Sequence, residues 1–305
     1  MNGRLPVFLI ACVSAALAQT KVPDLQGLWT NSSLTPLERP TELAGKPFLT
    51  EQEAADYEKH IMQQLDRDRR DGGADSDVGR GYNELFFDRG TRLGHINGKI
   101  PSSMVVDPPD GRVPPLTPEA QKRLQAARVE ASKHPADRAA DRSLQERCIL
   151  AAASGPPMLP GLYNNNFQIV QTRDYVMILM EMIHDVRIIP LDGRPHPPST
   201  VRNWLGDSTG HWEGSTLVVD TTNFTEKTGF RGSDQNLHLT ERFTRLDTQT
   251  ILYEFTVDDP TAFAKPWSGK LPFVTTSGSI FEYACHEGNY ALRDILAGAR
   301  AHEKK

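Results

Sequence analysis

Residues 237–257 read LHLTERFTRLDTQTILYEFTV, and this stretch decides the fold. Two runs rich in β-branched and aromatic side chains, Leu237 to Arg245 and Thr250 to Val257, flank the polar connection Leu246-Asp247-Thr248-Gln249. Apolar and polar side chains alternate along the first run, as they do on a strand with one buried face. The stretch therefore predicts an antiparallel hairpin.

Similar runs of β-branched and aromatic residues, separated by turn residues, continue over the second half of the chain. Further strands are expected at Phe167 to Thr172, Tyr175 to Ile189, Thr216 to Thr222 and Ser279 to Ala284, with a turn at Gly210 to Gly214. Sequential strands joined by short loops form antiparallel meanders, which lose their exposed edges by closing into a barrel. We therefore predict a mainly β, antiparallel barrel over residues 151–305, with a short C-terminal helix at about residues 290–301.

Residues 19–150 are expected to form an extended and helical region that packs on the barrel. A helix over Thr50 to Leu65 is predicted by apolar spacing and by a capping box formed by Thr50 and Glu53. Thr117-Pro118 supplies the N-cap and first residue of a second helix, which should end near residues 132–135. The Gly/Asp-rich segment Asp71 to Gly81 is typical of a mobile loop.

Two resemblances add to this outline. Gly27-Leu28-Trp29, followed by a β-meander, resembles the G-x-W opening of the lipocalin-like barrels, although the long helical insert departs from that pattern. Four other segments are together similar to a family of exported proteins of soil bacteria: Leu34 to Pro40, Val106 to Arg112, Glu181 to His196 and Trp204 to Phe224. The first resemblance implies a lipocalin-like architecture, and the second implies export without pointing to an activity.

The first eighteen residues have the organisation of a signal peptide. Arg4 supplies a positive charge, Leu5 to Leu17 is almost wholly apolar, and Ala16-Leu17-Ala18 forms a small-x-small cleavage site before Gln19. A lipoprotein box at Leu9 to Cys12, which would leave Cys12 lipidated, is the alternative. The apolar run is shorter than the roughly 20 residues of a transmembrane helix. We expect an exported chain, periplasmic or secreted, whose mature part has no transmembrane segment.

Removal of the signal would leave two cysteines, Cys148 and Cys285. An even pair in an oxidising compartment favours a disulfide. Two buried free thiols are the alternative reading. Thiolate binding of a metal is a third, weakened because neither cysteine has a C-x-x-C partner.

Charge and absent motifs narrow the function. The formal net charge is −5 and the basic residues are scattered, which argues against nucleic acid as the main partner. The sequence has no G-x-S-x-G elbow, no P-loop and no dinucleotide fingerprint after a strand, so a common serine hydrolase or a nucleotide-dependent enzyme is not expected. We predict no cofactor. A divalent metal bound by histidines and carboxylates from distant segments is an open alternative.

Strand alternation sorts the ionisable side chains of Tyr175 to Ile189 onto two faces. His184 is the sole polar residue on an otherwise apolar face, where it is either a hydrogen-bonded core residue or a catalyst. Glu181, Asp185 and Arg187 share the opposite face. If that face lines a cavity, their pKa values should be perturbed, and if it meets water they form a surface cluster.

Glu241 falls on the apolar face of its strand, with Leu237, Leu239 and Phe243. A buried carboxylate must be paired, hydrogen-bonded or protonated. One interpretation makes Glu241 a general acid or base. The other makes it the partner of a buried cation, either Arg187 or His184.

Other polar clusters lie on loops and strand ends, where catalytic groups are often held. They are the segment Asp192-Gly193-Arg194-Pro195-His196, the group Asp207, His211 and Glu213, the triplet Cys285-His286-Glu287 and the turn Tyr163-Asn164-Asn165-Asn166. None has the H-x-H or H-E-x-x-H spacing of a local metal site.

The leading hypothesis is an acid–base enzyme, a lyase, isomerase or hydrolase, that acts on a small and partly apolar molecule in a barrel pocket. His184 and Glu241 would donate and accept protons, Arg187 would hold an anionic group, and Asp185 would orient the imidazole if a kink brings it round. The substrate-binding candidates are Glu181, Tyr163, Asn165, Arg194, His196 and His238. A non-catalytic ligand-binding or envelope protein with the same barrel, and a metal-dependent enzyme, are the alternatives.

Overall fold

The structure is a computed structural model that describes residues 22–81, 83–151 and 155–303. The predicted signal peptide and the alternative lipoprotein box at Cys12 lie outside the described residues. Within the described ranges, no helix combines the length and the apolar composition needed to cross a membrane.

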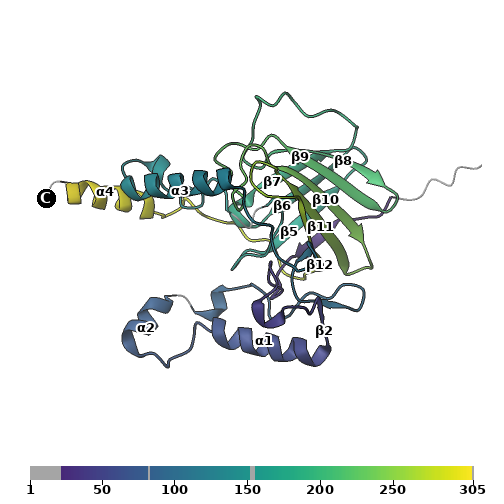
Figure 1. The fold of residues 1–305 in the computed structure, drawn as a ribbon, viewed down its shortest axis with the longest axis horizontal. Coiled ribbons are helices and arrows are strands. Elements are labelled where there is room, and N and C mark those ends of the chain that lie inside the picture. The colour runs from purple at the N-terminus through teal and green to yellow at the C-terminus, as the bar shows by residue number, and fades with distance from the viewer. Residues whose placement is uncertain (1–21, 82, 152–154, 304–305) are drawn as a thin grey trace, which may run out of the picture.

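One antiparallel sheet, curled into a nearly closed barrel, forms the larger part of the molecule (Figure 1). This confirms the predicted mainly β fold, which is consistent with a lipocalin-like barrel. In spatial order the strands are β7 (Val186–Pro190), β6 (Tyr175–Met180), β5 (Asn166–Gln171), β1 (Gly27–Thr30), β12 (Trp267–Thr275), β11 (Thr250–Asp258), β10 (His238–Arg245), β9 (Thr216–Thr222) and β8 (Asp207–Glu213). A short strand off this path, β4 (Val105–Asp107), pairs with β12.

The two end strands of this order, β7 and β8, meet along a seam. Within the described residues, no backbone ladder joins them. Side chains close the seam instead: Arg187 Nη2 donates to Ser208 Oγ at 3.3 Å. Farther along, Ile189 lies against Gly210, where an added Cβ would stand 2.8 Å from the Ile189 Cγ2 atom. Only glycine therefore fits this approach.

Inward side chains fill the barrel, as the alternation of β10 and β11 predicts. Tyr253 stacks on Phe273 with 4.7 Å between ring centroids, and Phe167 meets Phe273 edge-on at 4.8 Å. Trp29 of the G-x-W triplet is fully buried, donates from Nε1 to the Leu25 carbonyl at 3.0 Å and lies beneath the Arg245 guanidinium. Ring contacts of this kind stabilise a core beyond the area that they bury.

The segment around Met158 packs into the barrel core. Met158 is fully buried, its N–H donates to Tyr253 Oη at 2.9 Å, and its carbonyl accepts from Asn31 Nδ2 at 3.3 Å. These bonds satisfy backbone groups that would otherwise be buried without partners. The barrel interior is therefore occupied by the protein's own side chains and by this segment.

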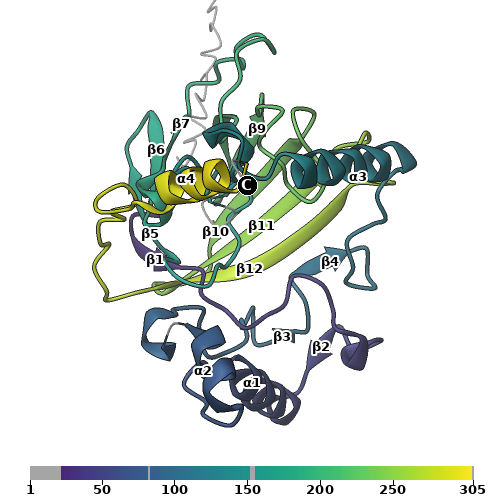
Figure 2. The same cartoon turned by 90° about the vertical axis from the view of Figure 1, so that its left-hand side faces the viewer.

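Three predicted helices are confirmed. The helix α1 (Glu51–Leu65) begins with the capping box of Thr50 and Glu53, and α3 (Pro118–Lys133) has Thr117 as its N-cap. The C-terminal helix is α4 (Ala291–Glu303). In Figures 1 and 2, α3 and α4 lie on the same side of the barrel.

The prediction of a mobile loop at Asp71 to Gly81 is wrong, because this segment contains the helix α2 (Gly73–Arg80). Arg80 forms ion pairs with Asp71 and Asp77, which tie the short helix to its flank. Together with α1 and the two-stranded pair β2 (Phe48–Leu49) and β3 (Ile100–Pro101), α2 lies beside the barrel as a separate layer (Figure 2). The described residues also contain the 3-10 turns η1 (Thr41–Leu43), η2 (Glu84–Phe86), η3 (Ala139–Asp141) and η5 (Met182–His184).

Two strand predictions and one turn prediction also need correction. Ser279 to Ala284 is not a strand, and the strand that completes the sheet is β12, whose Pro272 and Gly269 are typical of loops. The expected turn at Gly210 to Gly214 is mostly β8, which continues through Glu213. Tyr175 to Ile189 is a hairpin rather than one strand, with consequences for the candidate site described below.

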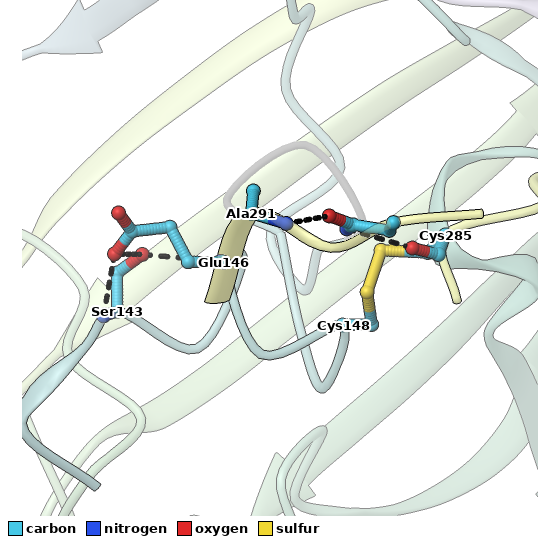
Figure 3. The surroundings of a disulfide bond; sticks show 6 residues. Ser143, Glu146, Cys148, Cys285 and Ala291 are labelled. Carbon is cyan, nitrogen blue, oxygen red and sulfur yellow. Dashed lines mark hydrogen bonds between the residues drawn. A yellow bond between two sulfur atoms is a disulfide. The ribbon is translucent and has the colours of Figure 1, made fainter. Parts of the chain in front are cut away.

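The predicted disulfide Cys148–Cys285 is present (Figure 3). It joins the segment after α3 to the segment before α4, across a sequence separation of 137. Within the C-terminal segment, the Asn289 amide donates to the Cys285 carbonyl and its oxygen accepts from the Ala291 N–H, which shapes the approach to α4. The disulfide fastens this segment to the body of the protein.

Candidate functional site

The hairpin between β6 and β7 changes the position of His184. Ile183 and His184 have left-handed backbone φ values of 60° and 49°, which reverse the chain between Met180 and Val186. His184 is exposed on this turn rather than set on a buried apolar face. Glu241 is fully enclosed within the barrel, so the two residues do not share a surface. The expected proton-transfer pair is therefore not assembled.

Arg187 and Glu241 form a buried ion pair inside the barrel. Arg187 Nη1 donates to Glu241 Oε1 at 3.0 Å, and Nη2 donates to Oε2. Tyr253 Oη also donates to Oε1, at 2.8 Å. Exposed fractions of 3% for Arg187 and 0% for Glu241 place both charges away from water. Of the two interpretations of Glu241, this geometry matches the one in which Arg187 is its partner.

Electrostatics keep Arg187 charged and Tyr253 protonated. Burial alone would lower the pKa of Arg187, but the Glu241 carboxylate outweighs burial and raises it overall. Burial and the same carboxylate raise the pKa of Tyr253 well above its ordinary value. Tyr253 therefore stays protonated and donates. Glu241, with both oxygens taken by donors, is poorly placed to accept a proton from a substrate.

Two predicted substrate-binding residues hold the protein together instead. Glu181 accepts from Asn166 Nδ2 at 2.9 Å and from the Phe281 N–H at 3.1 Å, which fastens the C-terminal segment beside the turn. Asn165 is buried, and its side chain bonds to Asp88 and to the backbone of Gly161. Both side chains are fully engaged within the fold.

Tyr163 and Arg194, two other predicted substrate-binding residues, lie apart from each other. Tyr163 and Asn164, with Phe86 and Phe87 from the helical layer, line a hollow of about 330 Å³. Arg194 is on the surface, where it bonds to Asp192 and to Tyr175 Oη. Its guanidinium lowers the pKa of Asp192 to about 2.

A chain of histidines and carboxylates, Asp207–His196–Asp220–His238, lies on the outer surface of the barrel. His196 Nδ1 is 2.7 Å from Asp207 Oδ1, and its Nε2 is 2.9 Å from Asp220 Oδ1. The second Asp220 oxygen is 2.5 Å from His238 Nε2. Thr209 Oγ1 stands 3.4 Å from His196 Nε2. We call these four linked side chains the His–Asp chain.

Three neighbouring strands and one loop position the His–Asp chain. Asp207 begins β8, Asp220 lies in β9 and His238 begins β10, each on the outward face of its strand. His196 comes from the loop between β7 and β8. That loop is fixed because the Asn203 N–H donates to the Asn223 carbonyl at 3.0 Å. The four side chains are partly exposed, so solvent and small molecules reach them.

Within the His–Asp chain, His238 and Asp220 shift each other's pKa in opposite directions. The hydrogen bond to Asp220, helped by its charge, raises the pKa of His238. The bond from His238, with the charges of His238 and His196, lowers the pKa of Asp220. At neutral pH this favours an ionised Asp220 that holds a His238 proton.

A groove of about 380 Å³ opens beside the His–Asp chain, at the seam between β7 and β8. Asp207 belongs to both, because it lines the groove and accepts from His196. Trp204, Leu205 and the exposed side chains of Val186 and Ile188 form apolar parts of the wall. Over the described ranges, no three His, Cys, Asp or Glu side chains are arranged to hold a metal ion.

The sequence identifies His196, Asp207 and His238 as candidates in separate segments, but it misses Asp220. The sequence does contain a clue to Asp220: it is the one charged residue of the strand TLVVDTT, and strand alternation places it on the face opposite to Leu217 and Val219. His211 and Glu213 pair with each other in β8, outside the His–Asp chain. The carboxylate that joins the two histidines becomes visible only when the β9–β10 register is known.

Neither the protein-family models nor the curated proteins nor the solved structures include a match to this chain.

Proposed function

We propose that this protein is an exported enzyme that performs acid–base chemistry on a small molecule at the His–Asp chain, without a nucleotide cofactor. The observation that carries the proposal is the bridging of His196 and His238 by the two oxygens of Asp220. A carboxylate that orients an imidazole and supports its protonated form is a recurring arrangement in general acid–base catalysis. Hydrolysis, elimination and isomerisation all use such a group.

His238 is the proposed catalytic residue. Its Nε2 is held by Asp220, whereas no described residue hydrogen-bonds to its Nδ1. The imidazole is partly exposed, and its raised pKa keeps a proton available near neutral pH. Nδ1 is therefore the atom from which a proton would pass to a substrate.

Asp220, His196 and Asp207 are proposed as positioning residues. Asp220 sets the direction of the His238 ring, and His196 holds Asp220 through its other oxygen. Asp207 in turn fixes His196 by its Nδ1. The proposed chemistry thus lies on the outer wall of the barrel, and neither at His184 on its exposed turn nor at Glu241 in the barrel interior.

The test is turnover of chromogenic p-nitrophenyl esters, glycosides and phosphates by the wild-type protein and two variants. His238→Gln should lower kcat/KM at least about 100-fold, the usual contribution of a general acid. Asp220→Asn should also shift the pH profile, because it removes the cause of the raised His238 pKa. His211→Gln is the matched control, since His211 is an exposed histidine on β8 of the same sheet and lies outside the His–Asp chain. Equal rates in wild type and His238→Gln would contradict the proposal.

A second candidate function is non-catalytic binding of a small, partly apolar molecule. It is favoured by a hollow of about 540 Å³ that is lined in part by the segment following Met158. Leu37, Met104, Leu159 and Phe230 supply its apolar lining, and Arg231 lies at its rim. Titration with 8-anilinonaphthalene-1-sulfonate, an apolar anion, tests it: Arg231→Gln should weaken binding, and unchanged affinity would contradict this function.

A further inference from the structure

We infer that a hollow beside η1 binds a phosphate group, free or on a small organic molecule, between the guanidinium groups of Arg39 and Arg112. The hollow has a volume of about 470 Å³. Its lining consists of the two arginines, Asp110 and small or apolar residues such as Pro40 and Ala44. None of the described lining residues belongs to the His–Asp chain, so the inference goes beyond the proposed function and does not depend on it.

Two segments that are distant in the sequence hold Arg39 at this hollow. The Arg39 N–H donates to the Gly111 carbonyl at 2.8 Å, and on the same segment the Leu37 carbonyl accepts from the Val105 N–H at 2.9 Å. Gly111 has a φ of 73°, and a Cβ there would stand 2.9 Å from Arg39 Cζ and Nη2. Glycine therefore makes this turn and also leaves the space that the guanidinium occupies.

The Arg39 side chain is buried, and neutral groups hold its guanidinium. Its exposed fraction is 6%. Nε donates to Ser102 Oγ at 2.9 Å, and Nη1 donates to the Pro109 carbonyl at 3.1 Å. Among the described residues Arg39 forms no ion pair, and the adjacent Glu38 pairs with Arg231 instead. A buried charge without a counterion is costly, so an anion that reaches this guanidinium is stabilised by it.

Arg39 keeps unused donors at the hollow. A guanidinium has five N–H donors in one plane, of which the fold uses one on Nε and one on Nη1. Nη2 donates to no other described residue. It is not among the fully enclosed unpaired polar atoms of the described chain, so it is open to the hollow that Arg39 lines. This edge of a guanidinium has the geometry that pairs with phosphate oxygens.

Arg112 adds a second cation to the lining. It is exposed, and its Nη2 donates to Thr41 Oγ1 at 3.2 Å, which steadies the side chain beside the hollow. Asp110 is the one carboxylate among the described lining residues. Its Oδ1 accepts from the Arg112 backbone N–H at 3.0 Å. The described lining therefore has two cations against one anion.

This arrangement favours a phosphate group over a carboxylate. A carboxylate has two oxygens in one plane, which a single guanidinium satisfies, whereas a phosphate group has three strong acceptor oxygens and a charge of about −1.5 to −2. Two guanidinium groups at separate positions, one buried and one exposed, suit the phosphate. Pro40, Ala44 and Pro109 supply the surface against which the organic part of a phosphomonoester would lie.

The probe is inorganic phosphate, titrated into the full chain at low salt and followed by isothermal titration calorimetry. Phosphate should bind, and acetate should bind at least tenfold more weakly. Glycerol 3-phosphate distinguishes the source of the group: tighter binding than that of inorganic phosphate indicates an organic phosphate, and equal or weaker binding indicates the free ion. Failure of both phosphate compounds to bind, or acetate bound as tightly as phosphate, would overturn the inference.

Variants locate the site. Arg112→Gln should weaken phosphate binding at least tenfold, whereas Arg128→Gln, which removes the same charge from an exposed position on α3, should not. Arg39→Lys keeps the buried charge but loses the planar fork, so it should also bind at least tenfold more weakly. Its urea midpoint shows whether it is folded, and Arg112→Gln decides if it is not. His238→Gln should bind phosphate like wild type, which separates this inference from the proposed enzymatic function.

Three results would show that the inference is wrong. Arg112→Gln or a folded Arg39→Lys would bind phosphate as tightly as wild type. Arg128→Gln would lose as much affinity as Arg112→Gln, which would indicate an unspecific effect of charge. His238→Gln would abolish binding, which would place the phosphate at the His–Asp chain.

Discussion

Arg187 and Glu241 lie on strands that are far apart in the sheet order, β7 at one end and β10 near the other, and nevertheless form a bidentate pair inside the barrel. They meet because the curled sheet brings β7 next to β8. Arg187 also bonds to Ser208 of β8, so one guanidinium spans the seam between the two end strands. The ion pair therefore contributes to barrel closure as well as to burial.

Removal of one partner of this pair should be strongly destabilising. Glu241→Gln or Arg187→Met leaves a buried charge without its counterion, at a cost of about 3–5 kcal/mol in free energy of unfolding. The double variant Arg187→Met/Glu241→Leu should lose less than either single variant, because no charge is then buried. Urea unfolding measures all three. A double variant less stable than both single ones would contradict this account.

Tyr253→Phe should cost about 1–3 kcal/mol, although it removes only one oxygen. The hydroxyl donates to Glu241 and accepts from the Met158 N–H, so its loss leaves a buried backbone donor without a partner. Tyr175→Phe is the control, because Tyr175 is exposed and its hydroxyl accepts from the surface residue Arg194. Chemical denaturation of both variants gives the comparison, and equal losses would refute the role of Tyr253.

The His238–Asp220 pair should make stability depend on pH. Because Asp220 raises the pKa of His238 in the folded state, the stabilisation is fully present below the ordinary histidine value of 6.5. It is lost as pH rises through the raised value. Unfolding measured from pH 5 to 9 should show this loss, and Asp220→Asn should flatten it. A variant that keeps the wild-type slope would assign the pH dependence to another group.

Loss of the disulfide should destabilise the folded state by about 4–5 kcal/mol on chain-entropy grounds, because the closed loop exceeds a hundred residues. The double variant Cys148→Ser/Cys285→Ser tests this without leaving a free thiol. The urea midpoint of unfolding of this variant should be unchanged by dithiothreitol. The midpoint of the wild type should fall to the same value when dithiothreitol is added. A wild type insensitive to the reductant under unfolding conditions would oppose the prediction.

Much of the fold is predictable because its signals are local. Thr50 with Glu53 and Thr117 with Pro118 mark helix starts through their own backbone bonds, and alternation places Glu241 inward. β12 is not predictable in this way. Pro272 and Gly269 oppose a strand, but β11 on one side and β1 and β4 on the other impose it through long-range pairing.

The candidate site is predictable only in pieces. Alternation fails at His184 because two consecutive left-handed residues turn the chain, and neither is a glycine that would mark the turn. His196, Asp207 and His238 are recognisable as polar residues in otherwise unrelated segments. Their convergence on Asp220 depends on the β8–β9–β10 register and on the loop that returns over β8, which no local pattern encodes.

The place of β1 in the sheet has a consequence for biosynthesis. β1 is the first strand in the described part of the chain, yet it pairs with β5, which begins only at Asn166, and with β12, which begins only at Trp267. A ribosome releases β1 long before either neighbour exists, so the barrel cannot complete its circle until β12 has emerged. Folding should accordingly be slow and post-translational, as expected for a chain whose defining contacts are the most distant ones.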